Sequence, residues 1–237
     1  MIDQMLLQKE AAALGILLDE TALDRFDRYS AELVQVNAHL NLTAITEPSE
    51  ILYKHWLDSL TVLWYCKPEK GVKCIDVGTG AGFPGTALLI ARPDLRMTLL
   101  DSTQKKLTFI AQTLETIGLA AQTVHLRAEE AGQMAAYREQ YDLVTARAVA
   151  NLRELCEYCL PFLQVGGMFV AMKSVRSAQE MDEAKNAVRC LGGQIFSIET
   201  FTLPVAGERS LILIKKISHT PSKYPRPSAK IAKQPIR

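Results

Sequence analysis

Short apolar segments alternate with helical segments along the chain after Gly71, and this rhythm limits the possible folds more than any other feature of the sequence. Five segments have the character of buried strands: VKCIDV, RMTLLD, QTVHL, YDLVTAR and GGMFVAMK. Because a helical stretch separates each from the next, they predict a parallel sheet with right-handed crossovers. Two further segments, QIFSIETFTL and RSLILIKK, are joined by too few residues for a helix and predict an antiparallel hairpin.

The chain of 237 residues is long enough for one large domain with an appendage. We expect residues 1–66 to form a helical region in which Thr21 caps one helix and Thr46 and Pro48 open another. Residues 67–217 predict an α/β domain with a Rossmann-like seven-stranded sheet, five strands parallel and followed by the antiparallel hairpin. This outline is typical of methyltransferase domains, but a fold alone does not define a chemistry.

Residues 218–237 form a basic tail that contains four prolines. Seven basic residues and no acidic one lie between Lys215 and Arg237, whereas the other 214 residues carry 20 basic and 26 acidic side chains. A Pro-containing, charged segment of this kind is expected to be extended and mobile without a partner. The positive charge at this end of the chain indicates a polyanionic partner.

The five cysteines and the hydropathy indicate a cytoplasmic protein. An odd number of cysteines, with no signal-type apolar stretch at the N-terminus, fits a reducing compartment. No apolar run approaches the roughly 20 residues that span a bilayer, so we expect no membrane anchor. Cys156 and Cys159 have the spacing of a metal knuckle, but no second pair accompanies them and they lie in a helical pattern. We expect them to pack in the core and expect no metal site.

The segment CIDVGTGAGFPG, residues 74–85, leaves a predicted strand and enters a predicted helix. Its glycines, including Gly78 and Gly80, allow backbone amides to approach a ligand at the start of the helix. Such a loop suits both S-adenosylmethionine and NAD. Asp76 precedes the first glycine and would sit badly beside a pyrophosphate, although it suits the ammonium group of a methionine moiety. It therefore favours S-adenosylmethionine, and a nicotinamide-dependent oxidoreductase remains the alternative.

An acidic residue also ends the next predicted strand. Asp101, with Ser102 directly after it, is placed to bind both hydroxyls of a ribose. The structural alternative is that Asp76 caps a turn and that Asp101 caps the following helix, and both roles can hold at once.

The region after the fourth predicted strand bears on the methyl acceptor. It reads TARAVANL, without the Asn or Asp followed by Pro-Pro and an aromatic residue that amine-methylating enzymes use, and no Pro-Cys nucleophile is present. Nitrogen 7 of guanine fits these absences, because its lone pair can attack a methyl group without loss of a proton. Arg147, Lys173 and Arg176 follow the fourth and fifth strands and could bind guanine and phosphate acceptors. For each of them the alternative is a solvated charge at a strand end.

Seven segments together resemble the small-subunit ribosomal RNA methyltransferase G family, also called glucose-inhibited division protein B. They occur in the family's order over nearly the whole chain: NLTAIT (41–46), HWLDSL (55–60), DVGTGAGFPG (76–85), LLDSTQKKLTF (99–109), RAEE (127–130), ARAVANL (146–152) and YPR (224–226). The tail departs from the pattern, because Pro227, Ala229 and Ile231 stand where the family has a basic residue, a glycine and a proline.

The resemblance implies methylation of guanine nitrogen 7 in 16S ribosomal RNA, with S-adenosylmethionine as the donor. It implies donor contacts at Gly78, Phe83, Ala128, Glu129 and Arg147, with Asp101 near the ribose. The expected catalytic residues are Arg147 and Lys173.

The expected contacts with RNA lie on two parts of the chain, the ends of the strands and the tail. They are Lys173, Arg176, Lys223, Arg226, Lys230 and Lys233.

Four polar residues of the helical region also match family positions: Asn37, Asn41, His55 and Asp58. We expect them to form a polar network between the helical layer and the sheet rather than to contact substrate. The partner is expected to be 16S ribosomal RNA or the small ribosomal subunit, bound by a monomer. A protein with this fold that binds RNA without turnover remains a second alternative.

Overall fold

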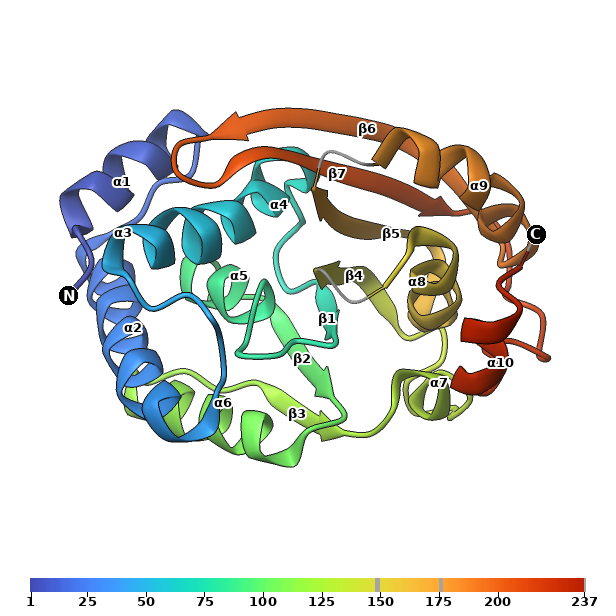
Figure 1. The fold of residues 1–237 in the computed structure, drawn as a ribbon, viewed down its shortest axis with the longest axis horizontal. Coiled ribbons are helices and arrows are strands. Elements are labelled where there is room, and N and C mark those ends of the chain that lie inside the picture. The colour runs from blue at the N-terminus through green and yellow to red at the C-terminus, as the bar shows by residue number, and fades with distance from the viewer. Residues whose placement is uncertain (148–149, 175–176, 237) are drawn as a thin grey trace.

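The computed structural model describes residues 1–147, 150–174 and 177–236, and it contains one seven-stranded sheet in the order β3-β2-β1-β4-β5-β7-β6 (Figure 1). The strands are β1 (Lys73–Val77), β2 (Arg96–Asp101), β3 (Gln122–His125), β4 (Tyr141–Arg147), β5 (Leu163–Ser174), β6 (Gly193–Leu203) and β7 (Gly207–Lys216). Strands β1 to β5 pair in parallel, and β7 is antiparallel to both β5 and β6. The predicted fold class is therefore confirmed.

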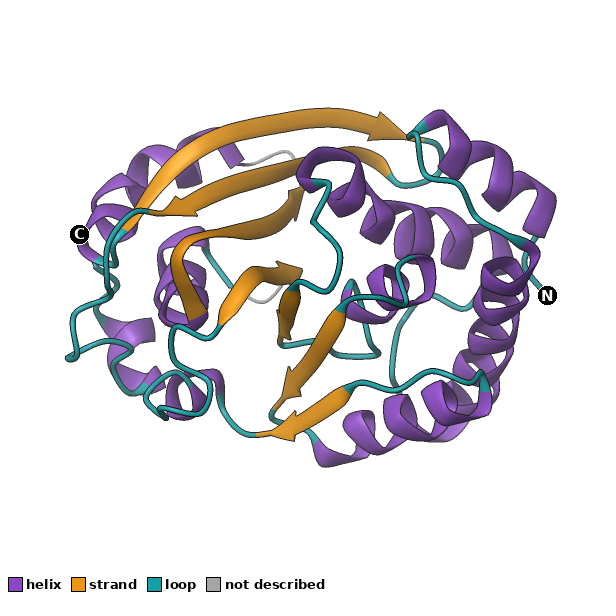
Figure 2. Cartoon of the chain, turned by 180° about the vertical axis from the view of Figure 1, so that it is seen from behind, coloured by secondary structure: helices purple, strands orange, loops and turns teal. Residues whose placement is uncertain are grey.

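Helices cover both faces of this sheet (Figures 1 and 2). The first group is α1 (Gln4–Ala13), α2 (Glu20–Leu40), α3 (Pro48–Glu50), the π-helical segment η1 (Ile51–Leu57), α4 (Asp58–Cys66), α5 (Gly85–Ala91) and α6 (Gln104–Thr116). The second group is α7 (Ala128–Ala131), α8 (Leu152–Cys159), the 3-10 turn η2 (Leu160–Phe162), α9 (Ser177–Cys190) and α10 (Ser228–Lys233).

Side chains that alternate along each strand divide the core in two. Leu211 and Leu213 of β7 pack with the first group of helices, whereas Ile212 and Ile214 pack with α8 and α9 on the other face. This is the alternation expected for a strand that is buried on both faces. Cys156 and Cys159 of α8 are fully buried in the second core.

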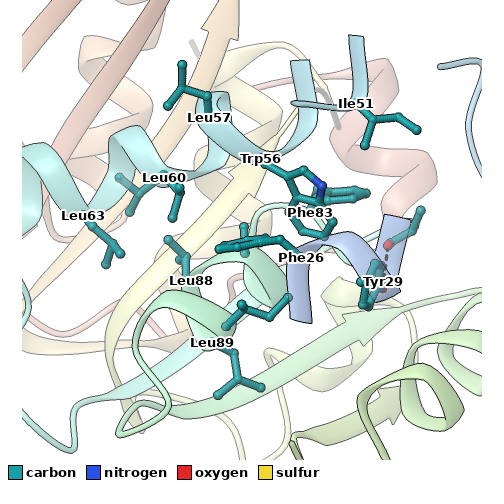
Figure 3. Packing of buried hydrophobic residues seen from close by; sticks show 14 of the residues in the cluster. Phe26, Tyr29, Ile51, Trp56, Leu57, Leu60, Leu63, Phe83, Leu88 and Leu89 are labelled. Carbon is teal, nitrogen blue, oxygen red and sulfur yellow. Dashed lines mark hydrogen bonds between the residues drawn. The ribbon is translucent and has the colours of Figure 1, made fainter. Parts of the chain in front are cut away.

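An aromatic cluster joins the N-terminal helices to the glycine loop. Phe26 and Tyr29 of α2 pack edge-on against Trp56 of η1, and Trp56 packs against Phe83 of the loop at 4.8 Å between ring centroids (Figure 3). The Tyr29 hydroxyl donates a hydrogen bond to the Ala81 carbonyl at 2.9 Å. The N-terminal helices therefore support the loop directly.

Helix α2 begins earlier than the sequence pattern indicated. Asp19 is its N-cap, and the Asp19 carboxylate accepts a hydrogen bond from the Ala22 amide at 2.7 Å. The expected cap, Thr21, lies inside the helix, so that prediction is wrong. An aspartate two residues earlier caps free amides at the start of the helix.

The helix that was expected to open at Thr46 and Pro48 contains the π-helical segment η1. The Asp58 amide bonds to the carbonyls of Tyr53 and His55, and the Lys54 carbonyl instead accepts a hydrogen bond from Arg147 at 2.9 Å. Changes of this kind in helical pitch often occur at functional sites. Here the change gives β4 a direct contact with the helical layer.

The expectation of an extended, mobile tail is wrong. Residues 228–233 form α10, which packs against α8, and the Ile231 side chain is fully buried. Ile236 is also buried and belongs to the core under α8 and α9. These two buried apolar side chains help to anchor the segment, although its proline content and charge favoured disorder.

Candidate active site

The glycine loop after β1 is organised around the buried carboxylate of Asp76. Its Oδ2 accepts hydrogen bonds from the Thr79 hydroxyl at 2.7 Å and from the Gly85 amide at 2.9 Å, and its Oδ1 accepts one from the Thr145 hydroxyl at 2.9 Å. Burial raises the pKa of this carboxyl. Asp76 therefore caps the turn, and its carboxylate accepts three hydrogen bonds from other residues of the protein.

At two positions of this loop the structure shows why the residue is glycine. Gly80 has a φ of +61°, a conformation that residues with a Cβ rarely adopt. At Gly85 a Cβ would lie 2.3 Å from Leu99 Cδ2 and 2.9 Å from Asp76 Cβ, so only glycine lets α5 begin against the sheet.

A pocket of about 240 Å³, here called the glycine-loop pocket, lies beside this turn. It is lined by Val77, Gly78, Leu100, Asp101, Ser102, Leu126, Arg127, Ala128, Glu129, Ala150, Glu154 and Tyr158. The structure thus brings together five of the predicted donor-binding residues, from Gly78 to Glu129. Ligand sites in open α/β sheets lie at this carboxyl edge of the parallel strands.

Asp101 couples this pocket to the glycine loop. Its Oδ2 accepts a hydrogen bond from the Gly80 amide at 2.9 Å, and its Oδ1 accepts one from the Thr103 amide at 2.8 Å. The carboxylate also lines the pocket. The same side chain can therefore hold the glycine loop and face a ligand, whereas the N-cap of the following helix α6 is Thr103.

Phe83 has a different environment from the one expected of a donor contact. It is buried in the aromatic cluster and is not part of the pocket lining, and His55 stacks on its ring at 4.3 Å between centroids. The Arg147 guanidinium lies 5.2 Å from the same ring. Phe83 connects the loop to a second pocket.

This second pocket, here called the arginine pocket, has a volume of about 570 Å³. It is lined by Ile45, Lys54, His55, Asp58, Arg147, Ala150, Met172, Lys173, Glu180 and Arg209. Ala150 lines both pockets, so they are neighbours. Four basic side chains, two carboxylates and a histidine therefore lie next to the glycine-loop pocket.

Arg147 is the centre of this pocket. Its Nη1 donates to the Lys54 carbonyl and, at 3.2 Å, to Asp58 Oδ2, and its Nη2 donates to His55 Nδ1 at 3.2 Å. Arg209 of β7 lies 3.5 Å from the other Asp58 oxygen. The guanidinium is thereby oriented by the helical layer, with the acidic residue between two arginines.

His55 is held in its neutral form. Burial and the nearby Arg147 charge lower the pKa of its imidazole to about 3. Nδ1 accepts from Arg147, so Nε2 carries the proton and donates to the Thr43 hydroxyl at 3.0 Å. Both ring nitrogens are occupied.

The expected polar network is present, and it includes three of the four predicted residues. The Asn37 carboxamide accepts a hydrogen bond from the Thr43 amide at 2.8 Å, which continues the chain through His55 to Arg147 and Asp58. Asn41 is instead the C-cap of α2, in a left-handed conformation with φ of 49°.

Lys173 of β5 also lines the arginine pocket. Its ammonium group donates to the Ala150 carbonyl and lies 3.1 Å from Glu180 Oε2 of α9. It therefore borders the space that joins the two pockets. Arg176 lies outside the described residues.

The predicted RNA contacts of the tail divide into two kinds. Lys223, Lys230 and Lys233 are exposed. Arg226 is not: its guanidinium forms two hydrogen bonds with the buried Glu157 carboxylate, at 2.8 and 2.6 Å. The Arg226 side chain is therefore engaged within the protein, and its contact with RNA stays a prediction.

Sequence reasoning missed several residues that line the two pockets. Lys54 and Arg209 belong to the arginine pocket, and Glu154 and Tyr158 belong to the glycine-loop pocket. The position of Arg209 at the start of β7 could have been a signal, because an antiparallel β7 begins at the carboxyl edge of its neighbours. No sequence signal marked Glu154 and Tyr158 as pocket residues, since they lie in an ordinary amphipathic helix.

Nothing in the described part of the chain resembles a metal centre, since no group of three or more His, Cys, Asp or Glu side chains could hold an ion. Within the same residues, none of the helices combines the length and the hydropathy needed to cross a bilayer.

The sheet order and the reversed β7 give this chain the Rossmann-like fold that methyltransferase domains have. A solved SAM-dependent O-methyltransferase from Thermotoga maritima has the same fold, with a TM-score of 0.52 and 14% identity, and the match covers 80% of this chain and 72% of that chain.

Sequence comparison gives the family. The family model described as rRNA small subunit methyltransferase G matches residues 22–212. A protein named ribosomal RNA small subunit methyltransferase G from Acetivibrio thermocellus is 46% identical, over 98% of this chain and 96% of its own length. One of the same name from Brevibacillus brevis is 44% identical, over 95% of each chain. The chain belongs to the rRNA small subunit methyltransferase G family.

Membership of this family makes S-adenosylmethionine the methyl donor. It also decides between the two ligands that suited the glycine loop, against the nicotinamide-dependent alternative.

Proposed function

We propose that this enzyme transfers a methyl group from S-adenosylmethionine to nitrogen 7 of a guanine in 16S ribosomal RNA. The observation that carries the proposal is the arginine pocket beside the glycine-loop pocket, in which cationic donors are abundant and the described histidine is neutral with both nitrogens occupied. Guanine nitrogen 7 carries no proton that must be removed before methylation. Such an acceptor suits this site, because its reaction requires correct positioning and no general base. The names of the relatives support ribosomal RNA as the substrate.

In this proposal the glycine-loop pocket binds the donor. Gly78, Ser102, Ala128 and Glu129 contact it, and Asp101 binds the ribose hydroxyls. Asp76, Gly80 and Phe83 act indirectly by fixing the loop, since their side chains or amides are engaged inside the protein.

The arginine pocket binds the acceptor guanine. Arg147 and Lys173 orient it through O6 of the base or through an adjacent phosphate, which leaves the lone pair of nitrogen 7 free. The nitrogen 7 lone pair forms the new bond to the methyl carbon as the bond from that carbon to sulfur breaks. No proton leaves the guanine, so His55 is not needed as a base.

The RNA strand continues over the exposed cations of the tail. Lys223, Lys230 and Lys233 are exposed, and no acidic residue follows Lys215 in the sequence. These lysines bind phosphates and do not recognise the base sequence. Arg176 also contacts RNA in this proposal, and this role rests only on its position after the fifth strand in the sequence. The protein acts as a monomer in the cytoplasm, which light scattering and fractionation can test.

Tritium transfer tests catalysis against RNA binding without turnover. Small subunits and naked 16S RNA from cells that lack this protein are incubated with methyl-labelled S-adenosylmethionine and the purified enzyme. Transfer to either one, and none to the same material from cells that contain the protein, supports the proposal. If the protein binds the donor and RNA but transfers no methyl group, it is an RNA-binding protein without turnover, and the proposed activity is overturned. The two substrates also separate naked RNA from the assembled particle.

A further inference from the structure

The segment from Thr220 to Ile236 lies beside α7 and α8, the two helices that form one wall of the glycine-loop pocket (Figure 1). Its backbone is held by side chains from the turn after α7. Arg138 donates to the carbonyls of Thr220 at 2.7 Å and Tyr224 at 2.8 Å, and Gln133 donates to the carbonyl of Pro225 at 2.8 Å. The bonds fix the path of the tail from 220 to 225.

Arg226 continues this attachment onto α8. Its backbone amide bonds to Glu157 Oε1 at 2.9 Å, and its guanidinium binds both carboxylate oxygens. Glu157 has no exposed surface, whereas the Arg226 side chain remains 16% exposed. Bidentate pairs of arginine and carboxylate fix direction as well as distance. Glu157 lies between Glu154 and Tyr158, which line the glycine-loop pocket from the same helix.

The tail also fixes the end of α7. The Gly132 carbonyl, directly after α7, shares the Arg138 Nη1 donor with Tyr224, at 2.9 Å. Pro225 packs so closely that a Cβ on Gly132 would lie 3.0 Å from its Cγ. Helix α7 has only four residues, and so short a helix depends on tertiary contacts. Ala128 and Glu129 of the pocket belong to it.

We infer that the tail is a clamp that sets the positions of α7 and α8 and thereby the shape of the donor site, with Arg226 and Glu157 as positioning residues. This inference rests on the proposed donor role of the glycine-loop pocket. The clamp has two faces: Arg226 and Ile231 point into the protein, whereas Lys223, Lys230 and Lys233 are exposed. Donor binding and RNA binding therefore depend on different side chains of the same segment.

Arg226→Gln and Glu157→Gln test the clamp, with Lys230→Gln as a matched control on the exposed face. Each variant is measured for S-adenosylmethionine Kd by calorimetry, for the donor KM and the RNA KM in methyl transfer, and for amide hydrogen exchange. We expect either anchor variant to raise the donor Kd by about 10-fold or more and to speed exchange in α8, because one charge of a buried pair loses its partner. The RNA KM should stay within about twofold, and Lys230→Gln should raise only the RNA KM.

Arg226→Lys keeps the charge but loses the bidentate geometry, and it is the variant to use if Arg226→Gln does not fold. It should give a smaller rise in donor Kd, about threefold. A folded Arg226→Gln or Arg226→Lys with wild-type donor Kd would overturn the inference, as would a rise in the RNA KM equal to that in the donor KM. A failure of the wild-type protein to bind the donor would instead contradict the proposed donor site itself.

Discussion

At the scale of single residues, burial decides what the polar groups of the site can do. His55 is shielded from water and faces Arg147, so it stays neutral, and Asp76 is fully engaged by the loop that it caps. The sequence placed Asp76 and Asp101 correctly at strand ends, because strand ends are readable from apolar patterns. It could not show that Phe83 turns into the core, since that depends on Trp56 and Tyr29 from distant segments.

The lowered pKa of His55 makes a prediction about stability and pH. Its folded pKa of about 3 lies below its ordinary value of 6.5, so the unfolded chain binds the proton more readily. The contribution of neutral His55 to the unfolding free energy is complete above pH 6.5 and is lost as the pH falls towards 3. Between pH 7.5 and 5 the wild type should lose about 2 kcal/mol more unfolding free energy than His55→Gln, which cannot take up that proton. Urea unfolding at the two pH values measures this, and equal losses would contradict it.

Asp101→Asn tests the ribose contact with little change of shape. The amide keeps the size of the side chain but removes the charge that strengthens hydrogen bonds from ribose hydroxyls and from the Gly80 amide. Donor binding should weaken by about 1.5 to 3 kcal/mol, or roughly 10- to 150-fold in Kd. Calorimetry with a folded variant gives the answer, and an unchanged Kd would remove Asp101 from the donor site.

At the scale of elements, the sheet and crossover helices followed from the sequence, but three local features did not. The π-helical turn of η1 depends on the Arg147 contact with the Lys54 carbonyl, and no pattern in the helix reveals it. The tail looked disordered because Ile231 and Ile236 are isolated among prolines and lysines. Glu157 looked like an ordinary helix residue, although it pairs with Arg226, which lies 69 positions away. Long-range pairs of this kind leave no periodic signal.

The start of α5 predicts a specific effect of Gly85→Ala. The added Cβ would overlap Leu99 and the Asp76 side chain, so the helix and the loop must move apart. We expect a loss of about 1 to 3 kcal/mol in unfolding free energy, as for other overpacked sites, together with weaker donor binding. Gly166→Ala is the control, because nothing lies within 4 Å of its Cβ and only its φ of +92° opposes the change. An unchanged donor affinity in Gly85→Ala would show that donor binding does not require the close packing of residue 85 against Leu99 and Asp76.

At the scale of the whole molecule, the small net charge of +1 conceals an uneven distribution. The tail is basic and exposes Lys223, Lys230 and Lys233, whereas its anchoring residues face the protein. Removing the whole tail would therefore disturb the fold, and substitution of exposed lysines is the cleaner experiment.

The triple variant Lys223→Gln, Lys230→Gln, Lys233→Gln should bind RNA with a weaker dependence on salt. If each lysine meets one phosphate of single-stranded RNA, the slope of log affinity against log salt should fall by up to about 2, at about 0.7 per phosphate. Filter binding across salt concentrations measures the slope, with S-adenosylmethionine binding as the control for folding. An unchanged slope would move the RNA contact away from the tail.

An atomic replacement in the RNA can show whether the enzyme transfers the methyl group to guanine nitrogen 7. A 16S RNA substrate that accepts label is prepared in two forms, with guanosine and with 7-deazaguanosine, which has a carbon in place of that nitrogen. We expect labelled 7-methylguanosine in the first and no transfer to the second, while both bind with similar affinity. Equal transfer to the 7-deaza substrate would contradict methylation at nitrogen 7, because the methyl group would then be on another atom.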